Sequence, residues 1–260
     1  MKRKALLISP NFQDLPGVKA DIDAWHSFLT SPMGGAWSES EICDTSKIIT
    51  EGLLTWDILQ PLVQDAFTAD YIFIAFSGHG GTYSQIEDKY GLPVTYIYLN
   101  DRECVPEYNF VPKEYGKRCT ILLDCCRTLD RNIPIIKTAS VIHESALLLA
   151  KAMARKCFDE ELVKCEFGLT RIYSTLLGHA AADIPSFTRC MIEGAKAQLI
   201  QSTVPDQVIL NLKEAVDIAK KDLITNHEMQ LPVYNAGRRR YHFPFAIISK
   251  DIVNSCFMKR

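Results

Sequence analysis

Apolar runs alternate along the chain with segments in which apolar residues recur every three or four positions. The runs Tyr71–Phe76 and Cys119–Leu123 are apolar at nearly every position, which is typical of parallel strands that are buried on both faces. In Val18–Leu29 and Leu53–Phe67 the apolar positions form one stripe and predict amphipathic helices. The same patterns predict further strands at Lys4–Ser9, Glu41–Cys43, Thr95–Leu99, Leu169–Ser174 and Phe243–Ile248, and further helices at Val141–Phe158, Phe187–Leu199 and Val208–Ile224.

The order of these elements predicts an α/β fold. Strands that alternate with helices form a mostly parallel sheet with helices on both faces, which is a three-layer α-β-α sandwich. We expect about six strands in the central sheet. Ligands of such sheets bind beyond the carboxyl ends of the strands. Residues that directly follow the buried strands are therefore the first candidates for a functional site.

Length, charge and hydrophobicity limit the expected number of domains and the expected kinds of partner. The 260 residues, 47% of them hydrophobic, are enough for one substantial core, and we expect a single domain over residues 1–260. The formal net charge of −2 predicts no nucleic acid partner. Arg238-Arg239-Arg240 is a dense basic run, but three residues make a weak nucleic acid footprint and a solvated loop explains them. No run approaches the ~20 apolar residues of a membrane span, so no membrane partner is expected.

The chain has nine cysteines, an odd number, with no Cys-x-x-Cys pair and no zinc-type spacing. This pattern favours reduced thiols in the cytoplasm over a disulfide framework. We expect no metal ion and no cofactor.

A histidine and a cysteine follow the two buried strands. Phe76-Ser77-Gly78-His79-Gly80-Gly81 presents His79, and Leu122-Leu123-Asp124-Cys125-Cys126-Arg127 presents Cys126. A thiol is a strong nucleophile near neutral pH, and a nearby imidazole raises its thiolate fraction or removes its proton during attack. The N–H groups of Gly80 and Cys126 are the expected oxyanion donors. Alone, each motif fits a buried core cysteine or a Gly-His-Gly turn; together they favour a cysteine hydrolase.

These motifs resemble those of caspase-fold cysteine proteases, in particular the metacaspase and paracaspase branch. The spacing of 47 residues between His79 and Cys126 is close to the roughly 50 residues of caspases. The resemblance covers roughly residues 3–200. It is carried by Ala5-Leu6-Leu7-Ile8, Leu15-x-Gly17-Val18-x-Ala20-Asp21, Ser77-Gly78-His79-Gly80, Asp124-Cys125-Cys126-Arg127, Ile172-Tyr173-Ser174, Gly178, Ala180, Asp183 and Phe187-Thr188.

The resemblance implies a caspase-like fold and a dyad in which His79 is the base and Cys126 the nucleophile. Cys125 falls on a variable position of the family motif. Because adjacent strand residues face opposite sides, only one of the two thiols can face His79. Cys126 is the preferred nucleophile, and Cys125 is the alternative.

The resemblance also implies a substrate preference. Caspases proper cleave after Asp, whereas metacaspases and paracaspases cleave after Arg or Lys and line the pocket for that residue, S1, with carboxylates. Asp21, Asp124 and Asp183 fall on such positions, and three carboxylates bind a guanidinium through charge-assisted hydrogen bonds. Alternatively, Asp21 only caps a helix or lies on its surface, and Asp183 is a solvent-exposed carboxylate in a loop.

One feature departs from the metacaspase pattern, and a second has two interpretations. Metacaspases continue the cysteine motif with His-Ser-Gly, but this chain has Arg127-Thr128-Leu129-Asp130, so calcium activation is not implied. The segment 137–168 corresponds to the linker that caspases cleave on activation. Its basic residues offer sites for self-cleavage, although an ordinary exposed helix also explains them: Lys137, Lys151, Arg155 and Lys156.

The main functional hypothesis is an endopeptidase that acts on a protein substrate in a regulated stress, defence or cell-death pathway. An activating partner or effector, or a homodimer formed through the last strand at Phe243–Ile248, would control it. The alternative is a catalytically latent or inactive caspase-fold scaffold. A nucleotide-binding or other acyl-transfer enzyme is a weaker reading, because the chain has no glycine-rich phosphate motif.

Overall fold

The computed structural model describes residues 1–12, 14–49, 52–87, 93–128, 148–183, 185–201, 207–226 and 230–249. Its centre is a six-stranded sheet in the order β10-β8-β7-β3-β1-β2, parallel except for β10. This confirms the predicted α/β class with a mostly parallel sheet. The strands are β1 (Arg3–Ile8), β2 (Ile42–Asp44), β3 (Tyr71–Ser77), β7 (Arg118–Asp124), β8 (Gly168–Tyr173) and β10 (Val233–Asn235).

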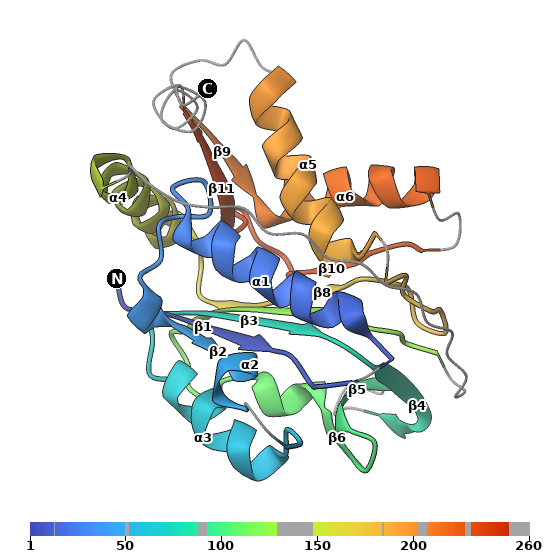
Figure 1. Ribbon diagram of the computed structural model, residues 1–260. Coiled ribbons are helices and arrows are strands. Elements are labelled where there is room, and N and C mark those ends of the chain that lie inside the picture. Colours follow the sequence, from blue (N-terminus) through green and yellow to red (C-terminus); the bar gives the residue numbers. More distant parts are fainter. Residues whose placement is uncertain are drawn as a thin grey trace.

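Helices cover both faces of this sheet (Figure 1). One face carries α1, α4, α5 and α6, and the other carries α3 with the short helices α2 and η2. Within the described residues, no helix is both long and apolar enough to cross a bilayer. The helices are α1 (Pro16–Thr30), η1 (Glu39–Glu41), α2 (Thr45–Ile48), α3 (Trp56–Ala66), η2 (Glu107–Phe110), α4 (Leu148–Lys164), α5 (Phe187–Gln201) and α6 (Leu212–Asn226).

The continuous apolar pattern of the central strands follows from burial on both faces. In β3, Tyr71 and Phe73 enter the core beneath α1, whereas Ile72 and Ile74 enter the core on the α3 side. All seven residues of β3 and of β7 are buried. A strand with two apolar faces is held in the middle of the sheet, and here that position is what aligns the ends of β3 and β7.

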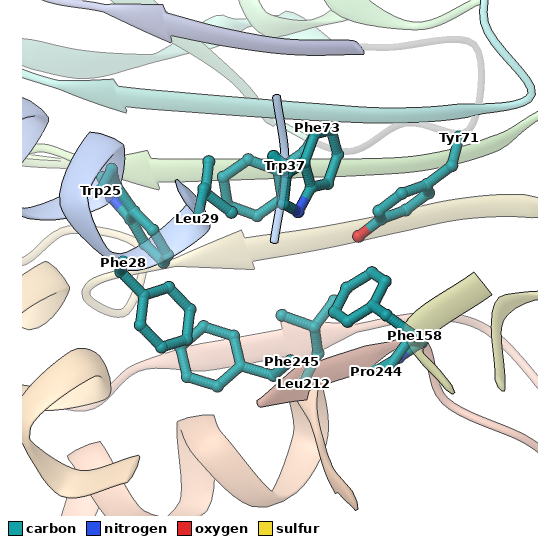
Figure 2. A pocket seen from close by; sticks show the side chains of 10 residues that line it. All are labelled: Trp25, Phe28, Leu29, Trp37, Tyr71, Phe73, Phe158, Leu212, Pro244 and Phe245. Carbon is teal, nitrogen blue, oxygen red and sulfur yellow. The ribbon is translucent and has the colours of Figure 1, made fainter. Parts of the chain in front are cut away.

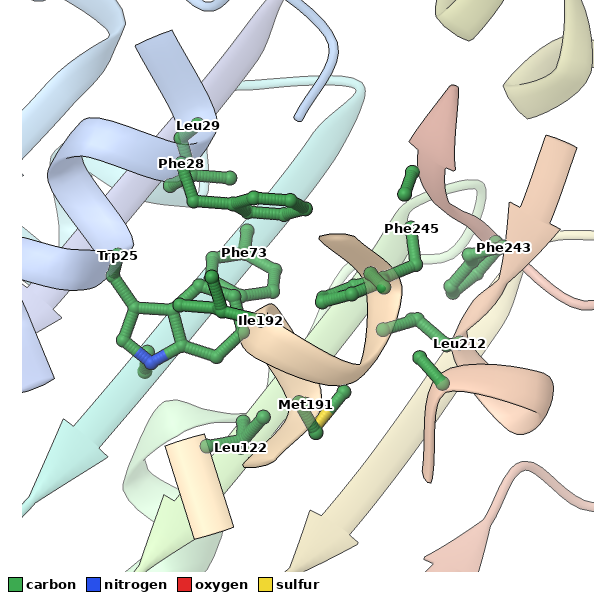
Figure 3. Close-up of a cluster of buried hydrophobic side chains, with 14 of the residues drawn as sticks. Trp25, Phe28, Leu29, Phe73, Leu122, Met191, Ile192, Leu212, Phe243 and Phe245 are labelled. Atoms are coloured by element: carbon green, nitrogen blue, oxygen red, sulfur yellow. The ribbon is translucent and has the colours of Figure 1, made fainter. Parts of the chain in front are cut away.

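Aromatic side chains dominate the core beneath α1 (Figure 3). Phe28 of α1 stacks on Phe245 with ring centroids 4.8 Å apart, and Trp25 meets Phe73 edge-on at 5.1 Å. A small apolar cavity lies among these rings (Figure 2), lined by Trp25, Phe28, Leu29, Trp37, Tyr71, Phe73, Phe158, Leu212, Pro244 and Phe245. Its lining carries no cluster of reactive groups, so we assign it to core packing.

Two smaller sheets flank the central one. β4 (Gly80–Glu87), β5 (Pro93–Asn100) and β6 (Glu103–Pro106) form an antiparallel sheet directly after His79, beyond the end of β3 (Figure 1). β9 (Gln207–Asn211) pairs with β11 (Pro244–Ser249). The predicted Thr95–Leu99 strand is therefore β5 of a separate sheet.

The predicted last strand, Phe243–Ile248, corresponds to β11 of a separate two-stranded sheet. β11 does not join the central sheet; one edge pairs with β9, and on the other the N–H of Ile247 donates to the Met33 carbonyl at 2.7 Å. Phe245, Ala246 and Ile247 are buried. A homodimer through this strand stays a prediction.

The predicted helix Val208–Ile224 is wrong in its first part. Residues up to Asn211 form β9, and α6 begins at Leu212. Asn211 caps the helix: the Glu214 N–H donates to its Oδ1 at 3.1 Å, and its own N–H donates to the Glu214 carboxylate at 2.9 Å.

The predicted helix Val141–Phe158 overlaps α4 but ends six residues too early. Residues 141–147 lie outside the described residues, as does the 137–147 part of the proposed cleavable segment, and α4 runs from Leu148 to Lys164. Arg155 of α4 donates to Glu41, and Asp159 pairs with the buried Arg3 at 3.5 Å. The described part of this segment is therefore a helix anchored to the core, and self-cleavage stays a prediction.

Candidate active site

The ends of β3 and β7 bring His79 and Cys126 to one edge of the sheet. Ser77 pairs in register with Asp124, and the Gly78 N–H donates to the Asp124 carbonyl at 3.1 Å. A Cβ at Gly80 would lie 2.5 Å from the Cys125 sulfur and 3.0 Å from the Cys126 carbonyl oxygen. Only glycine therefore allows the His79 loop to lie so close to the cysteine loop.

The two neighbouring thiols have different environments. Cys125 is 2% exposed and joins the core on the α3 side, where burial raises the pKa of its thiol well above the usual value. Cys126 is half-buried, and the Ala181 N–H donates to its Sγ at 3.3 Å. Burial raises the pKa of Cys126, and the Ala181 N–H opposes this shift. Of these two thiols, Cys126 is the one available for chemistry, and it needs a base.

The imidazole of His79 has a carboxylate partner that the sequence analysis missed. Its Nε2 lies 2.9 Å from Oδ2 of Asp14, in the loop between β1 and α1. The Phe12 ring meets the imidazole edge-on with centroids 4.6 Å apart. The His79 carbonyl accepts the Tyr98 N–H of β5 at 3.0 Å.

Asp21 and Asp124 lie close together beneath this edge. Asp21 of α1 is 1% exposed and accepts hydroxyl hydrogen bonds from Ser77 at 2.8 Å and Ser186 at 2.6 Å. The Asp124 carboxylate accepts the Thr188 N–H at 2.8 Å. Burial, and then repulsion by Asp124, raise the pKa of Asp21 to about 8. Burial also raises the pKa of Asp124.

Asp183 completes the group of three predicted carboxylates and is its most accessible member. It accepts the Gly17 N–H, and a Cβ at Gly17 would lie 2.2 Å from its Oδ1. Its Oδ2 is buried and has no hydrogen-bond partner among the described residues. Burial raises the pKa of Asp183, whereas the charges of Arg189 and His79 lower it and that of Asp14 raises it. The structure therefore gathers Asp21, Asp124 and Asp183, and of these three only Asp183 has a buried carboxylate oxygen without a hydrogen-bond partner among the described residues.

A basic residue of the chain itself lies beside these acids. Arg189 of α5 places its Nε 3.7 Å from Oδ1 of Asp21, and its side chain is 38% exposed. The sequence analysis did not identify this residue, because nothing in the local pattern of α5 distinguishes it from other exposed helical cations.

Arg127, directly after the nucleophile candidate, fixes the surrounding loops. It is buried, its guanidinium lies 3.9 Å over the Tyr173 ring, and its Nε donates to Thr95 at 3.1 Å. Its backbone N–H donates to the His179 carbonyl and its carbonyl accepts the Gly178 N–H, both at 2.9 Å. These bonds hold the loop that carries Ala181 against Cys126. In the described part of the chain, no group of three or more His, Cys, Asp or Glu side chains is arranged to hold a metal ion.

Asp21 predicts an unusual dependence of stability on pH. The folded chain keeps the Asp21 proton up to about pH 8, whereas an unfolded chain releases it near pH 4. The folded state binds more protons between these values, so its free energy of unfolding falls as pH rises through this window. We expect Asp21→Asn to stabilise the fold by on the order of 1–3 kcal/mol at pH 8 and to flatten this dependence. Urea unfolding from pH 5 to 8.5 measures it, with Asp23→Asn as the exposed control; parallel curves for wild type and Asp21→Asn would contradict it.

Both the sequence and the fold of the chain match those of known proteins. The chain belongs to the caspase domain family, whose sequence pattern matches residues 2–235. It is thus a caspase-like cysteine protease. Its fold is similar to the crystal structure of caspase-1 from Spodoptera frugiperda, with a TM-score of 0.52 and 12% identity over 90% of this chain and 87% of that chain. No curated protein sequence matches the chain. Membership of the metacaspase or paracaspase branch stays a prediction.

Proposed function

We propose that the chain is a cysteine endopeptidase that cleaves proteins after Arg or Lys, with Cys126 as nucleophile and His79 as base. The observation that carries this proposal is the convergence of a half-buried thiol, a histidine and three carboxylates at one edge of the sheet. Protein substrates follow from the protease class itself.

The dyad works through a covalent intermediate. Burial raises the pKa of Cys126, so His79 removes the thiol proton as the sulfur bonds to the substrate carbonyl carbon. The carbonyl oxygen becomes an oxyanion. When the carbon–nitrogen bond breaks, His79 returns the proton to the leaving amine and an acyl-enzyme remains. Water, deprotonated by His79, then attacks the thioester, releases the new carboxyl end and restores the thiol.

The oxyanion requires hydrogen-bond donors that are already in place. We assign the N–H groups of Gly80 and Cys126 to this role. The close approach of the Gly80 backbone to Cys126, which no larger residue permits, supports the pairing. Each such donor contributes on the order of 3 kcal/mol to transition-state stability.

The preference for a basic residue rests on the electrostatics of the pocket. Burial raises the pKa of both Asp21 and Asp124, and repulsion by Asp124 adds to the shift of Asp21, which the charge of Arg189 offsets only in part. The Oδ2 atom of Asp183 is a buried acceptor that has no hydrogen-bond partner among the described residues. A guanidinium or ammonium group placed there would form charge-assisted hydrogen bonds and relieve the repulsion among the acids.

The cellular setting is a further part of this proposal. No disulfide joins any of the eight cysteines within the described residues, which supports a reducing compartment such as the cytoplasm. A stress, defence or cell-death pathway, and control by an activating partner or effector, rest on the family resemblance.

Cleavage of a mixed-sequence peptide library by the purified chain tests the proposal. We expect new carboxyl ends at Arg and Lys, identified by mass spectrometry, and their loss in His79→Ala. Cleavage after Asp or Leu instead would overturn the pocket assignment. If no peptide is cleaved and a thiol probe that carries an arginine side chain fails to label Cys126, the scaffold interpretation replaces the proposal.

A further inference from the structure

We propose that Asp14 is a positioning residue that orients the imidazole of His79 and stabilises the imidazolium formed during the reaction, so that the catalytic unit is Cys126–His79–Asp14 rather than a dyad. This inference rests on the proposed function of His79 as base. It starts from the 2.9 Å contact between His79 Nε2 and Asp14 Oδ2, which joins residues 65 positions apart in the chain.

The contact fixes which ring nitrogen serves the thiol. An ionised carboxylate has only acceptor atoms, so Nε2 donates its hydrogen to Asp14. Nδ1 then carries the free lone pair and is the nitrogen left for the Cys126 proton. When that proton arrives, the ring becomes a positive imidazolium that keeps its Nε2–H bond to Asp14 and is stabilised by the negative charge of that carboxylate. Asp14 itself takes no proton at any step.

The surroundings of both residues favour a fixed geometry. The loop that carries Asp14 is closed by the Phe12 N–H bond to the Pro10 carbonyl at 3.1 Å and by the Leu15 N–H bond to the Phe12 carbonyl at 3.4 Å. The Phe12 ring contacts the imidazole at 4.6 Å. The His79 side chain is only 12% exposed, compared with 37% for Asp14. The imidazole is therefore confined by a ring and by a carboxylate from the same loop.

Asp14 also lies near Asp183, so the test must separate a role in substrate binding from a role through His79. The charges of His79, Arg189 and Asp14 all act on Asp183, so Asp14 lies near the acids proposed to bind the substrate cation. If Asp14 served the substrate, its removal would weaken binding of basic substrates. If it acts through His79, its removal slows any reaction of the Cys126 thiol, including reaction with a reagent that has no basic group.

Alkylation of Cys126 by iodoacetamide provides that test, because the reagent is small and neutral. The modified cysteine is identified by peptide mapping in the wild type, Asp14→Asn, His79→Ala, the double variant and the control Asp23→Asn. Asp23 is exposed and pairs with Lys19 on α1. We expect Asp14→Asn and His79→Ala each to slow alkylation at pH 7 by about 10- to 100-fold. The double variant should be no slower than His79→Ala, because the effect of Asp14 passes through the ring.

Several outcomes overturn the inference. A wild-type rate in Asp14→Asn, or an equal further loss when Asp14→Asn is added to His79→Ala, would show that Asp14 does not act through His79. With a basic peptide substrate, a rise in KM at unchanged kcat would assign Asp14 to substrate binding instead. If His79→Ala itself alkylates at the wild-type rate, the base of the proposed function fails, and the Asp14 role fails with it.

Discussion

Cys126→Ala is expected to abolish peptide cleavage, with a loss of at least about 10⁴-fold in kcat, because it removes the sulfur that we propose forms the acyl-enzyme. The half-buried Cys126 Sγ is held by the Ala181 N–H at 3.3 Å, and an alanine there removes the nucleophile without disturbing a packed core. The measurement is release of a fluorophore from a peptide that ends in arginine. The fold of the variant is checked by thermal unfolding.

Cys125→Ala is the matched control, since it removes the same atoms one residue earlier. Cys125 is 2% exposed and packs in the core on the α3 side. We expect kcat within about threefold of the wild type, but a stability lower by about 1 kcal/mol, because a small cavity is left in the core. The opposite result, an inactive Cys125→Ala and an active Cys126→Ala, would transfer the nucleophile to Cys125.

The central sheet could be predicted because the apolar runs that mark its buried strands lie within the strands themselves. β3 and β7 are buried on both faces, so nearly every residue between their ends is apolar or small, and the position of His79 and Cys126 followed from where those runs end. The prediction of a helix over the β9 segment was wrong for the opposite reason. Val208, Ile209 and Leu210 form a strand only because β11, more than thirty residues later, pairs with them, and no periodicity within the segment reveals a distant partner.

The candidate site was predictable only where a motif marked it. Gly80 and Cys126 lie beside each other as expected from the ends of adjacent parallel strands. No sequence motif identified Asp14 or Arg189. Asp14 reaches His79 across a loop, and Arg189 reaches Asp21 from a different helix. Both contacts depend on how α1 and α5 pack on the sheet, and that packing is set by many apolar residues that are far apart in the sequence.

Asp183→Asn is expected to remove most of the preference for a basic residue. An asparagine keeps an oxygen for the Gly17 N–H but loses the carboxylate charge and the unpartnered Oδ2 acceptor. Loss of one charge-assisted hydrogen bond, worth on the order of 3 kcal/mol, lowers kcat/KM for an arginine peptide by about 10²-fold. A peptide with citrulline, the neutral isostere of arginine, should change by less than about threefold, since it makes no ion pair. The ratio of the two kcat/KM values is the measurement.

Arg189→Gln should change that ratio in the opposite direction. The Arg189 Nε lies 3.7 Å from Asp21 Oδ1, so the chain supplies its own cation to the acids that we propose for the substrate. Removing it leaves these acids less neutralised, and we expect kcat/KM for the arginine peptide to rise by about 3- to 10-fold while that for citrulline stays unchanged. If Arg189→Gln instead lowers both values equally, Arg189 supports the fold of α5 against α1 and does not tune specificity. If Asp183→Asn lowers both equally, the cation is bound elsewhere.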